Sequence, residues 1–550
     1  MKKLRHIAAA ALGAIVLADT CSFSACGKGA NVIKKDSYTA DNRLILEYYG
    51  VDIDTLQAMT NDTKLIVDYI ENKFQVDFKF ITGTATTWLE TLNRNIAVGD
   101  VPDLFFHDAK DPSYSTWLKE KYLYDFGTQL DKYPNLTAQF SKYSEEMKDY
   151  LGGAWYGLPL ILDEDAKGTV VSEHAMYYRR DWYEKVKDYI PSNRYADENH
   201  RTIKDPEAAD FDYIDFYNLC EAFAKGDPDG DGKDNTAGFC ISKEGGIYWW
   251  NSVLSMFNVA YDGWTKNPDG SYSAQCISPQ MKEAVWFMAD MFDNGLLAHN
   301  YNTTMTTPNL YAEFGNGKFG IMVANSSYQN AVNIINSVTG GGASVEDIRA
   351  MPVVTGKDGV KRVMGAYNFY GFTSVYNDIS DTKKAKILEM MDLMLSKEGQ
   401  ELLSFGLEKT HYEKTADGKI NSLLGNDKKG YPYYLHSNEK APGIYFLKGL
   451  VSWDKNLLPE IAYYKQSQEI YDCWAKCDWL VLNKFMYMRL DSDLALITSD
   501  VNDSVATAYK NIVAKDSGAR ESIWTDFVNN FNSQNKYIAA VNEWAKKNIG

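Results

Sequence analysis

The first folded part of the sequence alternates strand-like and helix-like segments, and this order constrains the fold more than any other feature. Three segments carry alternating or continuous apolar residues, as strands do, and two carry apolar residues at helical spacing. In chain order the five segments are 44–49, 65–74, 76–80, 88–96 and 102–106. A β-α-β-α-β order predicts a mostly parallel sheet with helices on its faces. Because ligands bind beyond the carboxyl ends of such strands, we expect a binding site at the loops that follow the three strands.

The rest of the chain continues the α/β pattern and ends in helices. A second unit begins near Met176, and the clear elements after it are one strand and four amphipathic helices: strand 319–323 and helices 181–186, 211–224, 282–297 and 387–395. From about Leu457 to Gly550, apolar and aromatic residues recur at turn spacing, which predicts an almost wholly helical region. A chain of 550 residues is too long for one ordinary domain, so we expect two large lobes or three domains.

The composition excludes several classes of partner. The chain has 57 Lys and Arg against 74 Asp and Glu, a formal net charge of −17. We do not expect so acidic a protein to bind nucleic acid or an anionic membrane surface. Aromatic residues make up 14% of the chain and Tyr outnumbers Phe, which indicates many rings with one edge in contact with water.

The N-terminus has the features of a secretion signal with a lipid attachment site. A basic start precedes an apolar run at 7–18 that is too short to span a bilayer comfortably. The sequence Phe23-Ser-Ala-Cys26 resembles a bacterial lipobox, in which the cysteine receives diacylglycerol and becomes the new N-terminus. We expect residues 1–25 to be a signal peptide, Cys26 to be lipidated and 26–42 to be a polar tether. The alternative is an ordinary cleaved signal with an incidental cysteine. Lipidation places the protein on the extracellular face of the bacterial cytoplasmic membrane, attached through the lipid alone.

An acidic loop is the sharpest chemical motif of the sequence. Asp227, Asp229 and Asp231 stand at positions 1, 3 and 5 of a loop whose sixth residue is a glycine, and the carbonyl of Lys233 would supply position 7. Hard oxygen ligands at this spacing suit Ca²⁺. Position 12 is a glycine where a full EF-hand has a glutamate, so a further ligand has to come from Asn235 at position 9, the next threonine or elsewhere. Because the loop follows a helix rather than a sheet edge, we expect a structural Ca²⁺; the alternative is an Asx-rich turn without an ion.

Four motifs occur in the order and spacing of one known family. They are Gly99-Asp-Val-Pro-Asp-Leu-Phe105, Gly153-Ala-Trp-Tyr-Gly-Leu-Pro159, Tyr178-Arg-Arg-Asp-Trp182 and Gly406-Leu-Glu-Lys-Thr-His-Tyr-Glu413. Together they resemble the extracellular solute-binding proteins of carbohydrate ABC transporters, in the lipoprotein branch of that family. The resemblance implies an α/β, two-lobed, type II periplasmic-binding-protein-like fold with hinge crossings and a helical C-terminal region.

The resemblance also implies how the lobes are divided and what the protein does. By analogy, the N-terminal lobe holds 43–165 and 366–425, and the C-terminal lobe holds 166–365 and 426–550. A protein of this kind binds a carbohydrate, here an oligosaccharide, in the cleft between the lobes and delivers it to an ABC transporter permease. It is expected to be a monomer and not an enzyme.

Ten residues are expected to contact the ligand, because they fall at sheet edges, at the return crossing, or where the family places sugar-stacking rings: Trp88, His107, Asp108, Tyr248, Trp249, Trp250, Asn325, Tyr328, Tyr367 and Asn368. The apolar faces of a sugar ring fit an aromatic π-face, whereas its hydroxyl groups need polar partners. Each residue has a structural alternative, which is core packing for the rings, a helix cap for Asp108 and a turn for Asn368. Adjacent helical residues point about 100° apart, so at most two of the three rings at 248–250 can face one ligand.

Two other functions remain open from the sequence alone. The chain lacks G-x-S-x-G, H-E-x-x-H, phosphate-loop and C-x-x-C motifs. Its many carboxylates nevertheless leave a secreted glycoside hydrolase or lyase as one alternative. A peptide-binding lipoprotein is the other, suggested by the length of the chain.

Overall fold

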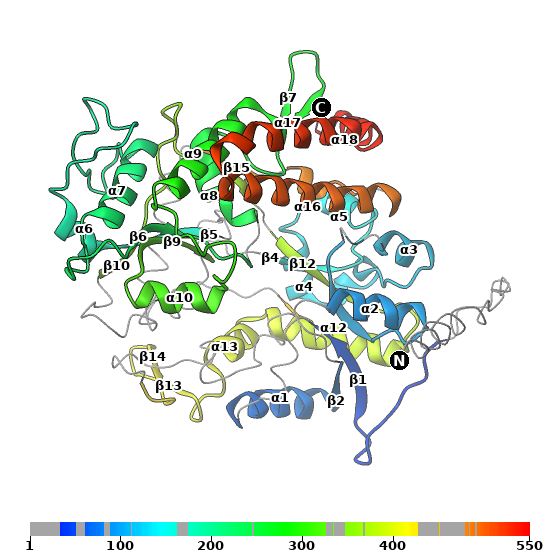
Figure 1. Ribbon diagram of the computed structural model, residues 1–550. Coiled ribbons are helices and arrows are strands. Elements are labelled where there is room, and N and C mark those ends of the chain that lie inside the picture. The colour runs from blue at the N-terminus through cyan, green and yellow to red at the C-terminus, as the bar shows by residue number, and fades with distance from the viewer. Residues whose placement is uncertain are drawn as a thin grey trace, which may run out of the picture.

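The computed structural model describes most of the chain: residues 33–50, 61–81, 88–109, 111, 113–161, 174–244, 247–325, 334, 347–366, 369–426, 450–451, 479–482, 484–489 and 492–549. These residues form two bodies, each built around its own sheet. In Figure 1 the first sheet lies toward the lower right and the second toward the upper left.

The first body holds a five-stranded sheet in the order β2-β1-β3-β12-β4. Its strands are β1 (Leu44–Tyr49), β2 (Val76–Ile81), β3 (Leu104–His107), β4 (Leu158–Ile161) and β12 (Phe369–Val375). β1 pairs in parallel with both β2 and β3, so the three strands predicted from the sequence form the expected parallel core. β12 comes from far along the chain and runs antiparallel to β3 and β4.

Helices cover both faces of this sheet, because successive residues of a strand point to opposite sides. Tyr48 faces one side and packs in a core with residues of α1 (Asn61–Phe74), α4 (Pro134–Phe140), α12 (Asp381–Leu395) and α13 (Lys397–Phe405). Tyr49 faces the other side and packs in a core with residues of α2 (Trp88–Ala97), α3 (Tyr114–Lys119) and α5 (Glu145–Tyr150). The first body is therefore a three-layer α/β/α unit.

The second body holds a four-stranded sheet in the order β10-β5-β9-β6. Its strands are β5 (His174–Arg179), β6 (Ala237–Cys240), β9 (Phe319–Asn325) and β10 (Ile348–Ala350). The helices of this body are α6 (Arg180–Val186), α7 (Tyr213–Lys225), α8 (Asn251–Leu254), α9 (Pro279–Asp293), α10 (Thr307–Gly315), α16 (Ser492–Ala514), α17 (Ser517–Ser533) and α18 (Asn535–Asn548). One apolar core joins this sheet to the C-terminal helices, which Figure 1 shows in orange and red across the top of the second body.

The chain passes between the bodies more than once. β4 of the first sheet is followed by β5 of the second, and β11 (Arg362–Ala366) leads from the second body into β12 of the first. β11 is held to the second body by the Met364 N–H, which donates to Oγ of Ser255 at 2.9 Å. β11 also pairs in parallel with β15 (Trp479–Leu482). Two small hairpins complete the fold: β7 (Trp264–Lys266) with β8 (Tyr272–Ala274), and β13 (Tyr412–Lys414) with β14 (Ile420–Ser422).

The structure confirms the α/β architecture and corrects two details. The C-terminal region contains the strand β15 where helix is predicted, because a short apolar run such as Trp479–Leu482 has no period that separates strand from buried helix. The second difference lies in the predicted tether, where Lys34 forms a bridge with Ile379 and its N–H donates to the Asp378 carbonyl at 2.7 Å. Residues 33–42 therefore lie against the first body. Within the described ranges, no helix combines the length and the apolar character needed to cross a membrane.

Candidate functional site

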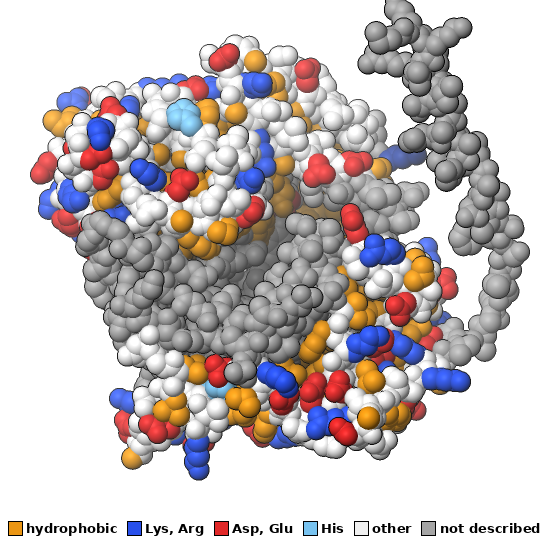
Figure 2. All heavy atoms as spheres, turned by 60° about the horizontal axis from the view of Figure 1, so that its bottom comes forward, with side chains coloured by type: hydrophobic (Ala, Val, Ile, Leu, Met, Phe, Trp, Pro, Cys, Tyr) orange, Lys and Arg blue, Asp and Glu red, His pale blue; other side chains and the backbone are white. Residues whose placement is uncertain are grey.

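The ends of four strands lie at the junction of the two bodies. Ile161, the last residue of β4, pairs with Phe369, the first residue of β12. His174, the first residue of β5, pairs with Asn325, the last residue of β9. These ends face the crossings, because the chain leaves one body just after β4 and re-enters it just before β12. Figure 2 shows the described surfaces of the two bodies on opposite sides of this region.

His107 ends β3 near this edge, but its side chain is buried. The ring stacks on Tyr114 at a centroid distance of 5.1 Å and lies 5.6 Å from Trp117 and 5.8 Å from Phe372. Nε2 lies 2.7 Å from Oγ of Ser374. Burial lowers the pKa of His107 to about 3, so the ring is neutral at physiological pH. At 0% exposure, His107 supports the sheet edge from the inside.

Asp108 follows His107 and is partly exposed. The turn before α3 uses a different carboxylate, because the side chain of Asp111 accepts a hydrogen bond from the Ser113 N–H at 2.7 Å. Nδ2 of Asn93 also donates to Asp111, at 3.3 Å. Asp111 thus shapes the turn, while the N-cap residue of α3, Ser113, makes no side-chain cap. Asp108 remains a predicted ligand contact.

The aromatic segment Tyr248–Trp250 forms a 3-10 helix that leads into α8. Trp250 is 1% exposed and packs 6.2 Å from Tyr301 and 6.4 Å from Tyr509, so it belongs to the core of the second body. Tyr248 is partly exposed and meets Tyr261 edge to face at 6.2 Å. Trp249 is also buried, at 8% exposure, and belongs to the same core, so Tyr248 is the one ring of these three that is partly exposed.

The remaining predicted ligand residues fall partly or wholly outside the described structure. Trp88 is the first residue of α2 and Asn325 the last of β9, as expected, while their side chains are outside the described part. Tyr328, Tyr367, Asn368 and the lipidation residue Cys26 lie outside the described residues. Their roles stay predictions.

Asp227, Asp229 and Asp231 come together in one turn directly after α7. Each offers one carboxylate oxygen, and the three oxygens lie within 4.8 Å of one another. Gly230 and Gly232 both have φ of +75°, a conformation that glycine adopts without strain and that turns the chain back on itself. The turn brings the side chains at positions 1, 3 and 5 of the predicted loop together, as the calcium interpretation requires.

The carboxylates of this loop are tied to its backbone. Both oxygens of Asp227 lie within hydrogen-bond distance of the Gly232 N–H, at 3.2 and 3.1 Å. Asp231 accepts from the Lys233 N–H at 2.9 Å and from Nδ2 of Asn235 at 2.8 Å. Desolvation raises the pKa of Asp231, but these hydrogen bonds outweigh it and lower the pKa. Lys233 Nζ lies 3.5 Å from Asp231, and Nζ of Lys185 donates to the Pro228 carbonyl of the same turn at 2.8 Å.

The donor set fits a hard divalent cation, and the fold explains why the loop lacks an EF-hand glutamate. Gly238 occupies position 12, and a Cβ added there would lie 2.3 Å from the carbonyl oxygen of Cys220 in α7. No side chain fits between β6 and α7 at this point. The Thr236 hydroxyl donates to the Phe223 carbonyl at 2.8 Å, which turns it toward the helix. Asn235, already bonded to Asp231, is therefore the better placed further ligand.

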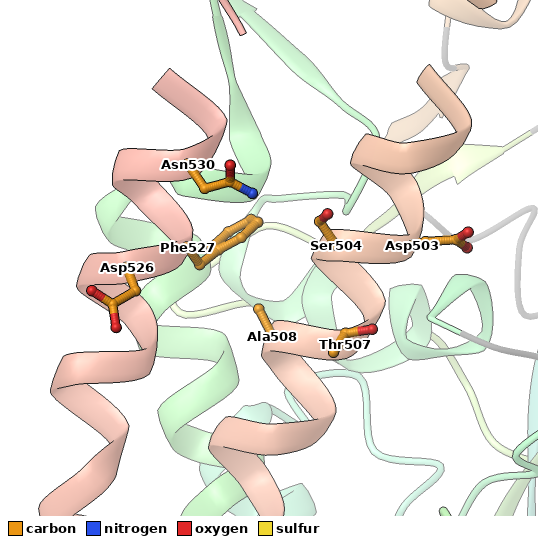
Figure 3. A pocket seen from close by; sticks show the side chains of 7 residues that line it. All are labelled: Asp503, Ser504, Thr507, Ala508, Asp526, Phe527 and Asn530. Carbon is orange, nitrogen blue, oxygen red and sulfur yellow. The ribbon is translucent and has the colours of Figure 1, made fainter. Parts of the chain in front are cut away.

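A separate open groove of about 450 Å³ runs between α16 and α17. Figure 3 shows Phe527 and Ala508 facing each other between the two helices, while Asp503 and Asp526 point away from the space between them. Asn530 and Ser504 also point toward this space, and none of the predicted ligand residues lines the groove. It is a seam between packed helices.

The sequence of this chain is similar to those of several known proteins. No family model matches the chain. The polygalacturonan/rhamnogalacturonan-binding protein YtcQ of Bacillus subtilis is 23% identical over 331 residues, which cover 60% of this chain and 59% of YtcQ. The lipoprotein LipO of the same bacterium is 23% identical over 391 residues, covering 70% of this chain and 68% of LipO. The fructooligosaccharide ABC transporter substrate-binding protein FusA of Streptococcus pneumoniae is 25% identical over 317 residues, covering 54% of this chain and 51% of FusA. The matches thus span little more than half of YtcQ and FusA.

Solved structures match over nearly the whole chain. The alginate-binding protein AlgQ2, in a crystal structure without calcium ion, has a TM-score of 0.65 at 14% identity, covering 94% of this chain and all of its own. FusA in complex with kestose has a TM-score of 0.65 at 17% identity, covering 92% of this chain and 99% of its own. Another FusA structure is of an EF-hand mutant, with a TM-score of 0.64. The resemblance inferred from the sequence motifs is therefore confirmed, and the chain is related to the substrate-binding proteins of carbohydrate ABC transporters and has their two-lobed type II fold.

Proposed function

We propose that this protein captures an oligosaccharide between its two lobes and delivers it to the permease of an ABC transporter. The observation that carries the proposal is the repeated crossing of the chain between two bodies that each hold their own sheet. Two relatives of the chain are named as a polygalacturonan/rhamnogalacturonan-binding protein and a fructooligosaccharide ABC transporter substrate-binding protein. Two bodies joined by short crossings can close like a hinge, and a ligand that contacts both bodies favours the closed state.

Stacked rings and hydrogen bonds to hydroxyl groups would supply the binding energy. The proposed stacking residues are those at rims and crossings: Trp88, Tyr248, Trp249, Tyr328 and Tyr367. The proposed polar contacts are Asp108, Asn325 and Asn368. His107 and Trp250 are fully buried, so we assign them the role of fixing the backbone behind these contacts.

A structural Ca²⁺ in the Asp227 loop belongs to the same proposal. The ligands would be Asp227, Asp229, Asp231, the Lys233 carbonyl and the Asn235 side chain, which together offer the hard oxygens that Ca²⁺ prefers. The support is the approach of three carboxylates to within 4.8 Å of one another, of which Asp231 is paired with Lys233. Such an ion would fix the connection between α7 and β6, away from the sheet edges at the crossings.

Lipidation at Cys26 would hold this protein, as a monomer, on the outer face of the cytoplasmic membrane, with the lipid as its one membrane contact. Lys34, a few residues after Cys26, forms ion pairs with Glu47 and Asp103 of the first body. A lipid at Cys26 would therefore keep the first lobe close to the membrane. The proposed bounds of the lobes remain 43–165 with 366–425 and 166–365 with 426–550.

The test is calorimetry with a panel of neutral and acidic oligosaccharides, combined with product analysis. We expect one ligand per chain and no product. Product formed at catalytic protein concentrations would overturn the proposal in favour of a hydrolase or lyase. Binding of peptides without binding of any glycan would favour a peptide-binding lipoprotein instead.

A pair of tryptophan variants tests the ring assignment. Trp249→Ala is expected to weaken oligosaccharide binding by about tenfold or more, since a stacked ring contributes on the order of 1 kcal/mol beyond its buried area. Trp286→Ala is the matched control, because Trp286 packs edge to face on Trp524 at 5.9 Å in the same body, on α9. Equal affinity of the two folded variants would refute a ligand contact at Trp249.

A further inference from the structure

A second group of ion-binding side chains lies at the start of α7, at the opposite end of the helix from the Asp227 loop. His200, Asp212 and Asp215 each offer one ligand atom, and these atoms lie within 4.8 Å of one another. The ring of His200 stands between two carboxylates. Its Nδ1 lies 2.7 Å from Oδ1 of Asp197, and its Nε2 lies 3.0 Å from Oδ2 of Asp212.

The hydrogen bonds of the two α7 carboxylates leave one oxygen of each for a ligand. Oδ1 of Asp212 caps the helix by accepting from the Ile214 and Asp215 N–H groups at 2.8 and 3.0 Å, which leaves Oδ2 facing His200. Oδ2 of Asp215 accepts from the Asp212 N–H at 3.1 Å and lies 2.9 Å from Nζ of Lys204.

Oδ1 of Asp215 is the independent sign of a ligand. The Asp215 side chain is 1% exposed, and this oxygen has no hydrogen-bond partner among the residues that the structure describes. Burying a carboxylate oxygen without a partner is unfavourable, so such oxygens are normally satisfied by a donor or a cation.

We propose that Nε2 of His200, Oδ2 of Asp212 and Oδ1 of Asp215 bind a divalent transition-metal ion, with Zn²⁺ as the best match. One imidazole and two carboxylates, with water in a fourth position, form a donor set that suits Zn²⁺. Two donors of one tetrahedral ion lie about 3.3 Å apart at ordinary bond lengths, close to the observed His200–Asp212 separation. Asp197 occupies the place behind the imidazole that a carboxylate commonly takes at metal-bound histidines.

A proton and a lysine are the competitors for this site. Burial lowers the pKa of His200, but the hydrogen bonds that its ring donates to Asp197 and Asp212 outweigh burial and raise the pKa, so a proton competes for Nε2. Lys204 binds Oδ2 of Asp215, the oxygen that the ion does not use.

The ionised groups around the site still favour a cation. Lys204 also lies 3.3 Å from Asp210, so it is shared between two carboxylates. Four aspartates, at 197, 210, 212 and 215, thus surround one ammonium and the imidazole. This site offers a nitrogen donor, Nε2 of His200, whereas the Asp227 loop offers only oxygen donors. The donor sets therefore favour Zn²⁺ at this site and Ca²⁺ at the Asp227 loop.

An ion here would tie the segment between α6 and α7 to the helix. Nδ2 of Asn218 donates to the His200 carbonyl at 2.9 Å, and Oε1 of Glu221 accepts from the Ser192 hydroxyl at 2.9 Å. The segment therefore already follows α7 along its length. The proposed zinc site and the Asp227 loop would fix the two ends of one helix.

The test is zinc titration of the chelator-treated protein in the presence of saturating calcium, followed by calorimetry and thermal melting. We expect one Zn²⁺ per chain with a dissociation constant below about 10 μM, a rise in melting temperature, and loss of both in His200→Gln. His299→Gln, which changes an exposed histidine of the same body, is the matched control and should retain both. X-ray absorption of the zinc-loaded protein should show one imidazole and oxygen donors, a readout that needs no variant.

Two outcomes would overturn the zinc site. Either zinc binding that is unchanged in His200→Gln, or no binding tighter than about 0.1 mM, would leave the cluster as a hydrogen-bonded network only. Asp229→Ala should bind zinc normally, since it alters the other end of α7. None of these measurements uses a sugar, so failure of the zinc site leaves the oligosaccharide proposal standing.

Discussion

The Asp103–Lys383 pair in the first body and the Asp227 loop on the second body hold carboxylates in opposite ways. Asp103 is 0% exposed, and its Oδ2 lies 2.6 Å from Nζ of Lys383, which is also buried. The same oxygen accepts from the Glu47 N–H at 2.8 Å, and Nζ of Lys34 lies 3.4 Å from the other oxygen. The Asp227 loop instead brings three exposed carboxylates together at the surface. A buried carboxylate needs its cations built into the fold, whereas an exposed cluster can take a cation from solution.

This difference bears on the role of the motif Gly99-Asp-Val-Pro-Asp-Leu-Phe105 in this chain. Asp103 is its second aspartate, whose Oδ2 accepts a hydrogen bond from Lys383 and whose Oδ1 has a longer ion pair with Lys34 inside the first body. Lys34 comes from the segment predicted as tether, which explains why residues 33–42 lie against the sheet. The motif therefore acts in packing, whereas the carboxylates of Asp227, Asp229 and Asp231 come together at the surface of the second body.

The largest test of the comparison removes the built-in cation. Lys383→Met should destabilise the first body by about 3–5 kcal/mol, because it leaves the buried Asp103 carboxylate without its closest positive partner. Urea unfolding measures the loss. Lys386→Met is the matched control on the same helix, since Lys386 is 36% exposed and its pair with Glu389 spans 3.3 Å at the surface. The control should change the free energy of unfolding by less than about 1 kcal/mol. Equal losses in Lys383→Met and Lys386→Met would mean that the buried pair is no more important for stability than the exposed pair.

The second test removes a carboxylate from the exposed cluster. Asp229→Ala should lower the melting temperature only in calcium, because the lost stabilisation is that of a bound ion. At a free calcium concentration of 100 times the dissociation constant, that stabilisation is about 2.7 kcal/mol. Melting in calcium and in chelator gives the two values to compare.

Asp269→Ala is the control for this loop. Asp269 is an exposed turn aspartate that accepts from the Ser271 N–H at 2.9 Å and from its hydroxyl at 2.6 Å. The Asp269→Ala substitution should lower the melting temperature by the same amount in calcium and in chelator. If Asp229→Ala behaved in this way too, the loop would be an Asx-rich turn without an ion.

Much of the fold and one end of α7 follow from local sequence. Apolar periodicity predicts the strands and helices of the first body, and the i, i+2, i+4 spacing of Asp227, Asp229 and Asp231 predicts their convergence. The requirement for glycine at position 238 does not follow from spacing, because it depends on how closely β6 approaches the carbonyl of Cys220. The strand β15 also cannot be predicted from local sequence, because its partner strand β11 lies more than a hundred residues earlier in the chain.

The residues of the proposed zinc site at the start of α7 could not be predicted either, because they come together only through the tertiary fold. His200 and Asp197 lie on the segment between α6 and α7, and they reach Asp212 only because that segment follows the helix. No repeat or motif marks the pair. For His107, the sequence correctly predicts a position at the end of a strand. It does not predict that the side chain is buried, because the burial depends on contacts with Tyr114 and Phe372.

His107 is also the third case in the comparison, a buried titratable group that is kept neutral instead of paired. Its Nε2 meets Oγ of Ser374, and that hydroxyl donates to the Tyr156 carbonyl at 2.5 Å, so Nε2–H is the donor to Ser374. The folded pKa of about 3 lies below the ordinary value of 6.5, so the unfolded chain binds the extra proton between these values. Stability from this residue is therefore full above pH 6.5 and falls as the pH is lowered toward 3.

The smallest of the three expected changes in stability is the pH dependence that follows from the lowered pKa of His107. Relative to His107→Gln, which does not titrate, the wild-type protein should lose about 2 kcal/mol of unfolding free energy between pH 7.5 and pH 5. Urea unfolding of both proteins at several pH values isolates this residue, since other carboxyl and histidine groups titrate equally in both. His299→Gln, at an exposed position, should show no such difference from wild type. A difference between wild type and His107→Gln that stays constant with pH would mean that His107 accepts its proton in the folded state as readily as in water, and that the aromatic cluster around it opens to solvent.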